Sequence, residues 1–235
     1  MNVLVTGGTG TVGRRCVARL VRAGHSIRVI GLDENLEIDG TEFRRCDITD
    51  YNALREQVKG IDGVVHLPAI PNSAGGTAPD IFHINCTGTF NVYQSAAEEG
   101  IKRAVSASSI NALGSNFGVK AFQFSYFPID KKYLHQTTEA YSLSKKILEE
   151  TTEYFSWRDG ISGVCLSLLG VRDPVDAPRA LLRRLRPSLS GDIRVAGRRT
   201  PGTRHCDLVT VRRNAAPNLP PSRSGLSPSD GWSRG

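Results

Sequence analysis

The stretch that decides the fold is Val5-Thr-Gly-Gly-Thr-Gly-Thr-Val-Gly13, near the start of a 235-residue chain. It follows the apolar run 2–6 and leads into 11–22, where apolar residues recur at helical spacing opposite four arginines. A glycine-rich turn between a buried strand and a helix N-terminus lets the backbone approach a pyrophosphate. The stretch therefore predicts a dinucleotide-binding turn. Its cofactor-binding glycines are expected to be Gly7, Gly10 and Gly13.

Strand-like and helix-like segments alternate from this turn to about residue 168. Such alternation implies right-handed crossovers and a parallel sheet covered by helices on both faces. The expected fold is therefore α/β, an open doubly wound (Rossmann) sheet. The expected strands are 2–6, 26–30, 42–46, 63–67, 103–107 and 162–168, and the expected helices are 11–22, 51–59, 79–99 and 139–154.

The charge is divided unevenly along the chain. The whole sequence carries 30 Lys and Arg against 23 Asp and Glu, a net charge of +7. Residues 1–172 hold 18 basic and 18 acidic side chains, whereas residues 173–235 hold 12 Arg and 5 Asp. We therefore predict a dinucleotide-binding domain over 1–172 and a distinct tail over 173–235. Because the neutral part carries the motifs, neither a nucleic acid nor a membrane is an expected partner.

The tail differs from the first part in composition. It has no Lys, Glu, Phe or Tyr, yet it holds 8 of the 12 Pro. Beyond one short helix near 181–185, it buries too little apolar area to offset its ordering entropy. Three interpretations stay open: a basic disordered arm, a degenerate substrate domain, or a terminus that is out of frame after about residue 172. In each, the C-terminal substrate domain is expected to be incomplete or missing.

The residue that binds the adenosine ribose is expected at the end of the second strand, roughly 20 residues past the glycines. Gly31 occupies the position where an acidic residue is most often found, and Asp33 follows two residues later. Asp33 at the ribose hydroxyls would favour NAD, whereas Arg28 or another basic group would accept the phosphate of NADP. The expected cofactor is NAD or NADP, with a preference for NAD.

Tyr141-Ser-Leu-Ser-Lys145 places a phenol and an ammonium four residues apart, on one face of a helix. A Tyr with a pKa near 10 is a poor base at neutral pH, and a nearby cation stabilises the phenolate and lowers that pKa. The pair is suited to exchange a proton with a carbinol or carbonyl oxygen. Ser108 and Ser109 end the fifth strand, where a hydroxyl can hydrogen-bond the reacting oxygen.

Seven stretches, in order, carry a family resemblance: 5–13, 46–50, 64–69, 85–91, 100–105, 108–109 and 141–145. Through them, residues 1–172 resemble an extended short-chain dehydrogenase/reductase of the NAD-dependent epimerase/dehydratase family. The resemblance implies that Ser109 is the catalytic Ser, that Tyr141 is the acid/base and that Lys145 binds the nicotinamide ribose. It also implies a homodimer formed through two long helices. Further cofactor contacts are implied at Thr11, Val12, Asp47, Ile48, Leu67, Pro68, Ala69 and Asn85.

Two functions follow from these motifs. The first is an NAD(P)-dependent oxidoreductase that transfers a hydride to or from a hydroxyl or carbonyl of a sugar-like substrate, with Tyr141 as acid/base. The segment 109–141 resembles sugar or sugar-acid dehydrogenases more than nucleotide-sugar epimerases. The alternative is a dinucleotide-binding module without efficient turnover, because its substrate domain is lost.

Cysteine and histidine usage bears on location and metal binding. The five cysteines are widely spaced without a C-x-x-C pair, which is typical of reduced thiols in a cytoplasmic protein. No apolar run approaches the roughly 20 residues that span a bilayer, and the segment after Met1 does not resemble a signal peptide. The histidines show no metal-binding spacing, so no metal is expected, and His66 is expected to be a buried strand residue.

Residues 110–138 match neither the helix nor the strand period. A loop of this length is usually functional, and it is rich in aromatic residues. Two interpretations stay open: the loop lines a substrate pocket at the carboxyl edge of the sheet, or it is a packed cover over that edge. Its aromatic residues are Phe117, Phe122, Phe124, Tyr126, Phe127 and Tyr133.

Overall fold

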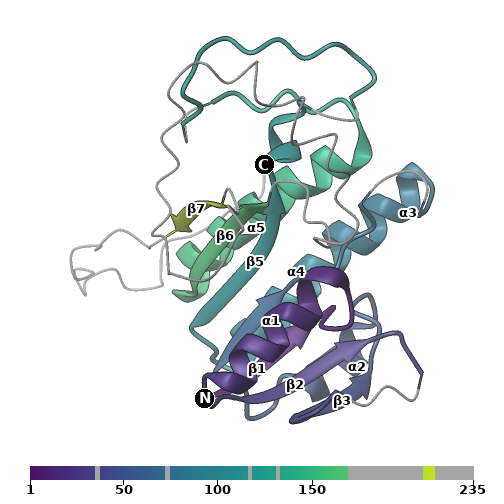
Figure 1. The fold of residues 1–235 in the computed structure, drawn as a ribbon, viewed down its shortest axis with the longest axis vertical. Helices are drawn as coiled ribbons and strands as arrows, with labels where there is room; N and C mark the ends of the chain where they lie inside the picture. Colours follow the sequence, from purple (N-terminus) through teal and green to yellow (C-terminus); the bar gives the residue numbers. More distant parts are fainter. Residues whose placement is uncertain (35–37, 72–74, 116–117, 131–132, 169–208, 215–235) are drawn as a thin grey trace, which may run out of the picture.

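The computed structural model describes residues 1–34, 38–71, 75–115, 118–130, 133–168 and 209–214. One sheet of seven strands forms its centre, in the order β3-β2-β1-β4-β5-β6-β7 (Figure 1). The strands are β1 (Asn2–Thr6), β2 (Ser26–Gly31), β3 (Thr41–Arg45), β4 (Gly63–His66), β5 (Arg103–Ser109), β6 (Ser162–Leu168) and β7 (Val209–Asn214). The α-helices are α1 (Thr11–Arg22), α2 (Tyr51–Gln57), α3 (Ala78–Phe82), α4 (Gly88–Glu98) and α5 (Ala140–Asp159).

Strands β1 to β6 are parallel, which confirms the doubly wound α/β prediction. After β1 the chain builds outward through β2 and β3, and it then returns to add β4 on the other side of β1. The strand order therefore reverses between β1 and β4. In open α/β sheets, ligands bind at the carboxyl ends of the strands on either side of such a switch point.

Two apolar cores cover the two faces of the sheet, because neighbouring residues of a strand point to opposite sides. On β1, Val3 and Val5 pack with Val17 of α1, whereas Leu4 packs with Val92 of α4 and other residues on the opposite face. Leu4 and Val5 are both fully buried. Burial on both faces explains the uninterrupted apolar run that begins the chain.

The helix boundaries follow the sequence signals closely. The Asp50 carboxylate accepts a hydrogen bond from Ala53 N at 3.0 Å and caps α2, as its sequence position predicts. Helix α5 runs five residues further than predicted, to Asp159, and is capped by Gly160, which has a φ of +68°. The single helix predicted over 79–99 is instead α3 and α4 joined by a π-helical turn, His83–Thr87.

Strand β7 was not predicted. It pairs antiparallel with β6, from Gly163 opposite Asn214 to Leu168 opposite Val209. A six-residue edge strand gives a weak periodic signal, and the surrounding Pro- and Arg-rich composition obscured it. The rest of the tail, including the short helix predicted near 181–185, lies outside the described residues. Within the described ranges, no helix is long and apolar enough to cross a membrane.

Candidate active site and dinucleotide-binding turn

The glycine turn between β1 and α1 has no room for side chains at Gly7 and Gly13. Gly7 has a φ of +67°, and a Cβ at Gly13 would lie 2.2 Å from the Gly7 carbonyl oxygen. Gly10 precedes α1 without any side-chain cap, and the first turn of α1 contains no acidic residue. The first turn of α1 therefore brings no carboxylate of its own to the N–H groups of Thr11 and Val12, and the helix end favours an anion. These features fit a pyrophosphate group.

Asp33 lies next to this turn. A Cβ built on Gly31, the last residue of β2, would lie 3.3 Å from Asp33 Oδ2 and 3.5 Å from Thr9 Oγ1. Asp33 is exposed, so its carboxylate is accessible at the carboxyl end of β2. Asp33 thus brings a carboxylate to the edge where a ribose-binding acidic residue is expected, two residues beyond its usual position.

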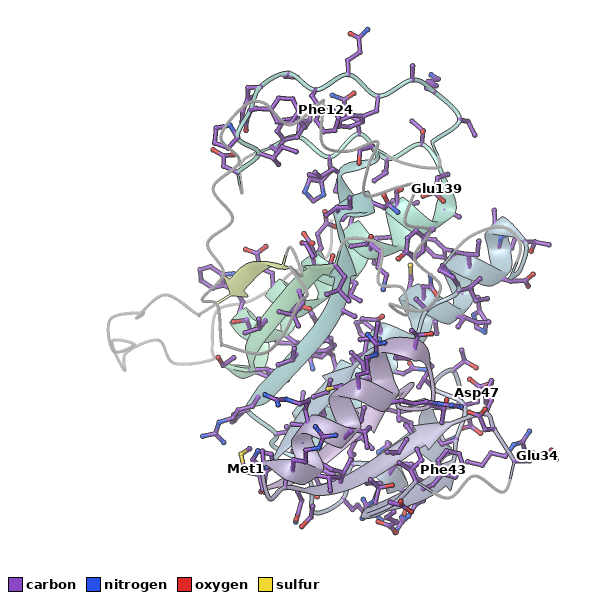
Figure 2. All side chains as sticks on the ribbon, viewed as in Figure 1. Met1, Glu34, Phe43, Asp47, Phe124 and Glu139 are labelled. Carbon is purple, nitrogen blue, oxygen red and sulfur yellow. The ribbon has the colours of Figure 1, made fainter. Side chains whose placement is uncertain are left out.

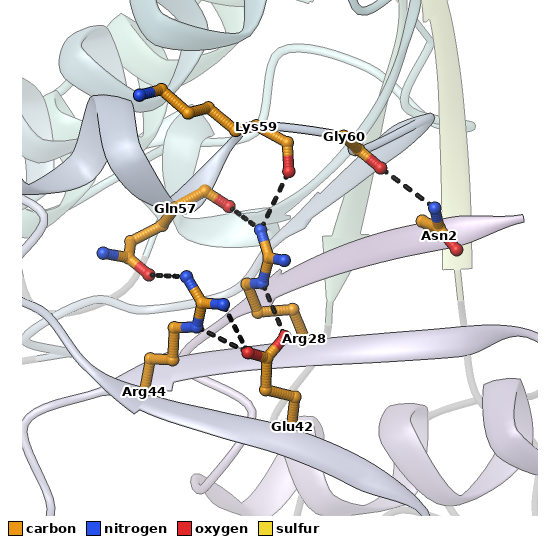
Figure 3. A network of polar contacts seen from close by, with 7 residues as sticks. All are labelled: Asn2, Arg28, Glu42, Arg44, Gln57, Lys59 and Gly60. Atoms are coloured by element: carbon orange, nitrogen blue, oxygen red, sulfur yellow. Dashed lines mark hydrogen bonds and ion pairs between the residues drawn. The ribbon is translucent and has the colours of Figure 1, made fainter.

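Arg28, the alternative partner predicted for an NADP phosphate, already donates hydrogen bonds to other residues. Its Nε donates to Glu42 Oε2 at 2.9 Å, and its Nη1 donates to the carbonyl oxygens of Gln57 and Lys59 at 2.8 and 3.0 Å (Figure 3). Glu42 is shared with Arg44, and hydrogen bonds from both guanidinium groups lower its pKa. These contacts hold Arg28 within the β2–β3 pair, so we expect another basic group to meet the phosphate if NADP binds.

A different arginine lies at the end of β3. Arg45 pairs with Gly31 across the strands, and its Nε donates to the carbonyl oxygen of Leu32 at 3.3 Å. Arg45 is exposed. It therefore places a cation close to Asp33 at the edge where an adenosine ribose is expected.

Asp47 and Ile48 follow β3 and lie at the same edge. The backbone N–H of Cys46 donates to Gly31 O at 3.0 Å, which draws the end of β3 against the end of β2. Asp47 is exposed near the segment that carries Glu34 (Figure 2), and Asp47 Oδ1 accepts two hydrogen bonds from Thr49 at 2.8 Å. Ile48 is buried against α4, where a Cβ on Gly88 would lie 2.4 Å from its Cδ1.

The segment after β4 lies directly against the glycine turn. Leu67 N donates to Thr6 O at 3.2 Å, and a Cβ on Gly7 would lie 2.9 Å from Pro68 N. Leu67, Pro68 and Ala69 are all partly buried. The switch between β1 and β4 thus brings two predicted cofactor-binding segments, 60 residues apart in the chain, into contact.

Asn85 lies in the π-helical turn and is 4% exposed. Its Oδ1 accepts from Ile70 N at 2.8 Å, and its Nδ2 donates to Ile70 O at 3.1 Å and to Ser144 Oγ at 3.0 Å. Ser144 Oγ in turn donates to the carbonyl oxygen of Tyr141 at 2.7 Å. Asn85 therefore connects the segment after β4 with the first turn of α5. Single-turn π-bulges are frequent at functional sites.

Ser109, Tyr141 and Lys145 converge where β5 ends and α5 begins. Tyr141 is 9% exposed, and the Ser109 hydroxyl hydrogen-bonds it. Lys145 is 3% exposed; its Nζ lies 5.7 Å from the centre of the Tyr141 ring and donates to Ala107 O at 2.7 Å. The structure thus brings together the three side chains expected to be catalytic.

The electrostatics of this group differ from the expectation. Burial raises the pKa of Tyr141, the Ser109 hydrogen bond opposes that rise, and the Glu139 carboxylate adds to it. Burial also lowers the pKa of Lys145 to about 8, against the opposing effects of Cys165, Cys86 and Glu149. The pKa of Tyr141 is therefore raised, whereas the sequence predicted that it would be lowered.

Sequence reasoning missed several residues that support this group. Glu139 caps α5, accepting from Tyr141 N at 2.7 Å and from Ser142 N. Glu149, one turn beyond Lys145, accepts from Ser108 Oγ at 2.6 Å and is 6% exposed. The four-residue spacing of Lys145 and Glu149 was a usable signal, whereas nothing local indicated that Ser108 would meet Glu149.

The aromatic loop after β5 extends beyond the sheet, where Figure 2 labels Phe124. Its rings contact one another: Phe122 and Phe124 lie 4.9 Å apart between centroids, and Tyr126 and Tyr133 lie 4.8 Å apart. Tyr133 is buried, but Phe127 is 70% exposed. The loop is thus an aromatic cluster with one open side. Phe117 lies outside the described residues.

Among the described residues, no group of three or more His, Cys, Asp and Glu could hold a metal ion. His66 is 1% exposed with both ring nitrogens in hydrogen bonds, which confirms it as a buried strand residue.

The chain is similar to several known proteins. It is 30% identical over 120 residues to "Sterol demethylase protein B" of Methylococcus capsulatus, covering 49% of this chain and 37% of that protein. It is 36% identical over 113 residues to the uronate dehydrogenase of Agrobacterium fabrum, covering 48% and 42%. A short-chain dehydrogenase/reductase superfamily protein from Agrobacterium tumefaciens, solved with bound NAD, matches with a TM-score of 0.63 and 27% identity, covering 71% of this chain and 48% of that one.

These matches span less than half the length of the relatives and of that solved chain. The family itself is decided by a longer match, because a sequence model described as the NAD dependent epimerase/dehydratase family matches residues 3–203. The match includes the glycine turn, the Asn85 turn and the Ser109–Tyr141–Lys145 group. This chain therefore belongs to the NAD dependent epimerase/dehydratase family.

Proposed function

We propose that this chain is an NAD(P)-dependent oxidoreductase that transfers a hydride between the nicotinamide and a hydroxyl or carbonyl carbon of a sugar-like substrate. The proposal depends chiefly on the convergence of Ser109, Tyr141 and Lys145 at the carboxyl end of β5, on the sheet edge that also carries the glycine turn. This geometry suits proton exchange with the oxygen of the reacting carbon.

The residues present fit a nicotinamide dinucleotide. The glycine turn and the start of α1 would hold the pyrophosphate, and Asp33 would hold the adenosine ribose through its hydroxyls. Asp47, Ile48 and the segment 67–69 lie along the same edge. When bound, the nicotinamide would supply the hydride donor or acceptor.

Tyr141 would move the proton at its phenol oxygen. Because burial raises the pKa of Tyr141, the phenol is protonated at neutral pH and is ready to donate to a carbonyl oxygen. The Ser109 hydroxyl would hold that oxygen beside the phenol. In the direction of alcohol oxidation, Tyr141 must first lose its proton, so that activity should rise as the pH increases above neutral.

The sugar-like substrate is supported by the uronate dehydrogenase relative. The first relative described above carries a sterol name instead, and the partly exposed aromatic cluster after β5 would also suit an apolar ring system. A substrate screen therefore needs aldoses and uronates in one arm and hydroxysterols in the other. Turnover of sterols alone would contradict the sugar-like assignment.

The decisive experiment combines a cofactor titration with this screen, using the full chain and its Tyr141→Phe variant. We expect NAD binding by both proteins, turnover by the wild type, and a loss of roughly 100-fold or more in kcat for Tyr141→Phe, which loses only the phenol oxygen. Full turnover by Tyr141→Phe would remove Tyr141 from the reaction. NAD binding without turnover of any substrate would favour the alternative, a binding module that lacks efficient catalysis.

We also propose a homodimer formed through α4 and α5. Phe90 of α4 and Tyr154 of α5 lie with their rings 6.4 Å apart and are 43% and 47% exposed, and Trp157 nearby in α5 is 53% exposed. An exposed aromatic surface on two adjacent helices suits burial against a second copy. Light scattering of wild type and Phe90→Glu tests this: the variant should be monomeric, and a monomeric wild type would contradict the proposal.

We propose a cytoplasmic location, supported by the wide spacing of the five cysteines, which form no C-x-x-C pair. Proteins of oxidising compartments more often carry cysteines in a disulfide framework. Fractionation of the native host tests this location, and recovery of the protein outside the cytoplasm would contradict it.

A further inference from the structure

His66, at the end of β4, lies in a closed polar environment. Its Nδ1 lies 2.8 Å from Thr6 Oγ1, and its Nε2 lies 3.0 Å from Thr89 Oγ1. Burial, together with the charge of Lys145, lowers the pKa of His66 to about 3. The ring is therefore neutral at physiological pH, and a neutral imidazole has one donor nitrogen and one acceptor nitrogen.

The hydrogen-bond partners fix which nitrogen carries the proton. Thr89 Oγ1 lies 2.5 Å from the carbonyl oxygen of Asn85, which can only accept, so the Thr89 hydroxyl donates there. A hydroxyl has a single proton, so Thr89 must accept from His66 Nε2–H. The Nδ1 atom of His66 then accepts from the Thr6 hydroxyl. The result is a one-way chain of three hydrogen bonds from Thr6 through His66 and Thr89 to Asn85.

This chain ends on the residue that connects the two halves of the site. Asn85 holds both backbone polar groups of Ile70, the residue after the cofactor-lining segment 67–69, and it donates to Ser144 in α5. Ser144 donates to the carbonyl oxygen of Tyr141. A π-helical turn lacks the regular pattern of i→i+4 hydrogen bonds, so the contact from Thr89 adds a constraint on the Asn85 carbonyl.

We propose that His66, as the Nε2–H tautomer, and Thr89 are positioning residues that fix Asn85 and thereby hold the cofactor-lining segment in register with Tyr141. The role of Tyr141 in catalysis belongs to the proposed function, on which this inference rests. Neither His66 nor Thr89 touches the reacting atoms. They act through the geometry of Asn85.

Thr89→Val tests the proposal, because it keeps the shape of the side chain but leaves His66 Nε2–H and the Asn85 carbonyl without their partner. We expect kcat to fall roughly 10- to 100-fold, with KM changed by less than about threefold. Thr89→Ser restores the hydroxyl and should recover most of kcat. Thr152→Val is the matched control: Thr152 is equally buried, and its hydroxyl bonds Tyr93 and Leu148 rather than Asn85.

Two readouts do not require turnover. Amide hydrogen exchange at Ile70, whose N–H donates to Asn85, should accelerate about tenfold in Thr89→Val but not in Thr152→Val. The ¹⁵N spectrum of His66 in the wild type should show a protonated Nε2 and a bare Nδ1. If the wild type turns over no substrate, the proposed function fails, whereas these two readouts still test the hydrogen-bond chain.

Three results would overturn the proposal. A protonated Nδ1 on His66 would reverse the chain. Wild-type kcat and wild-type Ile70 exchange in Thr89→Val would show that Asn85 needs no such support. An equal loss of kcat in Thr152→Val, or the absence of rescue by Thr89→Ser, would reduce the effect to a general loss of packing.

Discussion

Replacing Lys145 by Met removes an ammonium that folding buries. The side chain is 3% exposed, and burial lowers its pKa from 10.5 to about 8. Each pKa unit corresponds to about 1.4 kcal/mol, so the charged form costs the folded protein about 3 kcal/mol. The hydrogen bond from Nζ to Ala107 O, 2.7 Å long, stabilises the folded protein by about 1 kcal/mol. At pH 7, Lys145→Met should therefore be more stable than the wild type by about 2 kcal/mol, although we expect it to be inactive.

The stability of the wild type should change with pH in one direction. The folded pKa of Lys145 lies below the unfolded pKa, so the unfolded chain binds more protons between about pH 8 and pH 10.5. The wild type should thus gain stability as the pH rises through this window. Well below pH 8, burial of the charged Lys145 should cost the folded protein its full free-energy penalty. By pH 10 the penalty falls to about 1 kcal/mol, and the advantage of Lys145→Met should disappear.

Urea unfolding followed by circular dichroism at pH 7 and pH 10 measures this difference. Lys146→Met is the matched control, since Lys146 is the next residue in α5, its side chain is 37% exposed and it pairs with Glu150 at 3.7 Å. The control should change by a similar small amount at both pH values. Equal stability differences between wild type and Lys145→Met at pH 7 and pH 10 would refute the reasoning.

Gly13→Ala should prevent the turn from forming, because its Cβ would lie 2.2 Å from Gly7 O. The Cβ of Gly10→Ala would meet nothing closer than 3.5 Å. In urea unfolding, the free energy of unfolding of Gly10→Ala should therefore stay within about 1 kcal/mol of the wild-type value. Asp33→Ala should weaken NAD binding about tenfold in a fluorescence titration, and an unchanged Kd would place the ribose elsewhere. Arg45→Gln should weaken NADP binding about tenfold while Arg28→Gln leaves it unchanged; the opposite result would reinstate Arg28 as the phosphate ligand.

The sheet and the glycine turn were predictable because their signals are local. The run Asn2–Thr6 is apolar throughout because both faces of β1 are buried, and the glycines follow at once because side chains at Gly7 and Gly13 would collide with backbone. The predicted bounds of β6 match the structure. Ser109, Tyr141 and Lys145 lie together in the structure, and spacing and the family resemblance had singled them out. Their catalytic roles stay a proposal.

The remaining features depend on contacts between distant residues. Asn85 and Ser144 are 59 positions apart, so no window of sequence shows that one binds the other. The partners of Arg28 were hidden for the same reason, since Glu42 and the carbonyl of Lys59 come from other segments. The Tyr141 pKa was misjudged because spacing reveals a neighbouring charge but not burial. The division of the chain at residue 172 stays a prediction.

The π-helical turn His83–Thr87 makes the orientation of the preceding side chains sensitive to the length of this segment. Such a turn holds one residue more than the α-helix around it, which is equivalent to a single-residue insertion. Each residue of an α-helix turns the chain by about 100°. Loss of one residue here would restore a regular helix but rotate every side chain before it by that angle relative to α4. Single-residue gaps should therefore be rare at this point among homologues that retain the site.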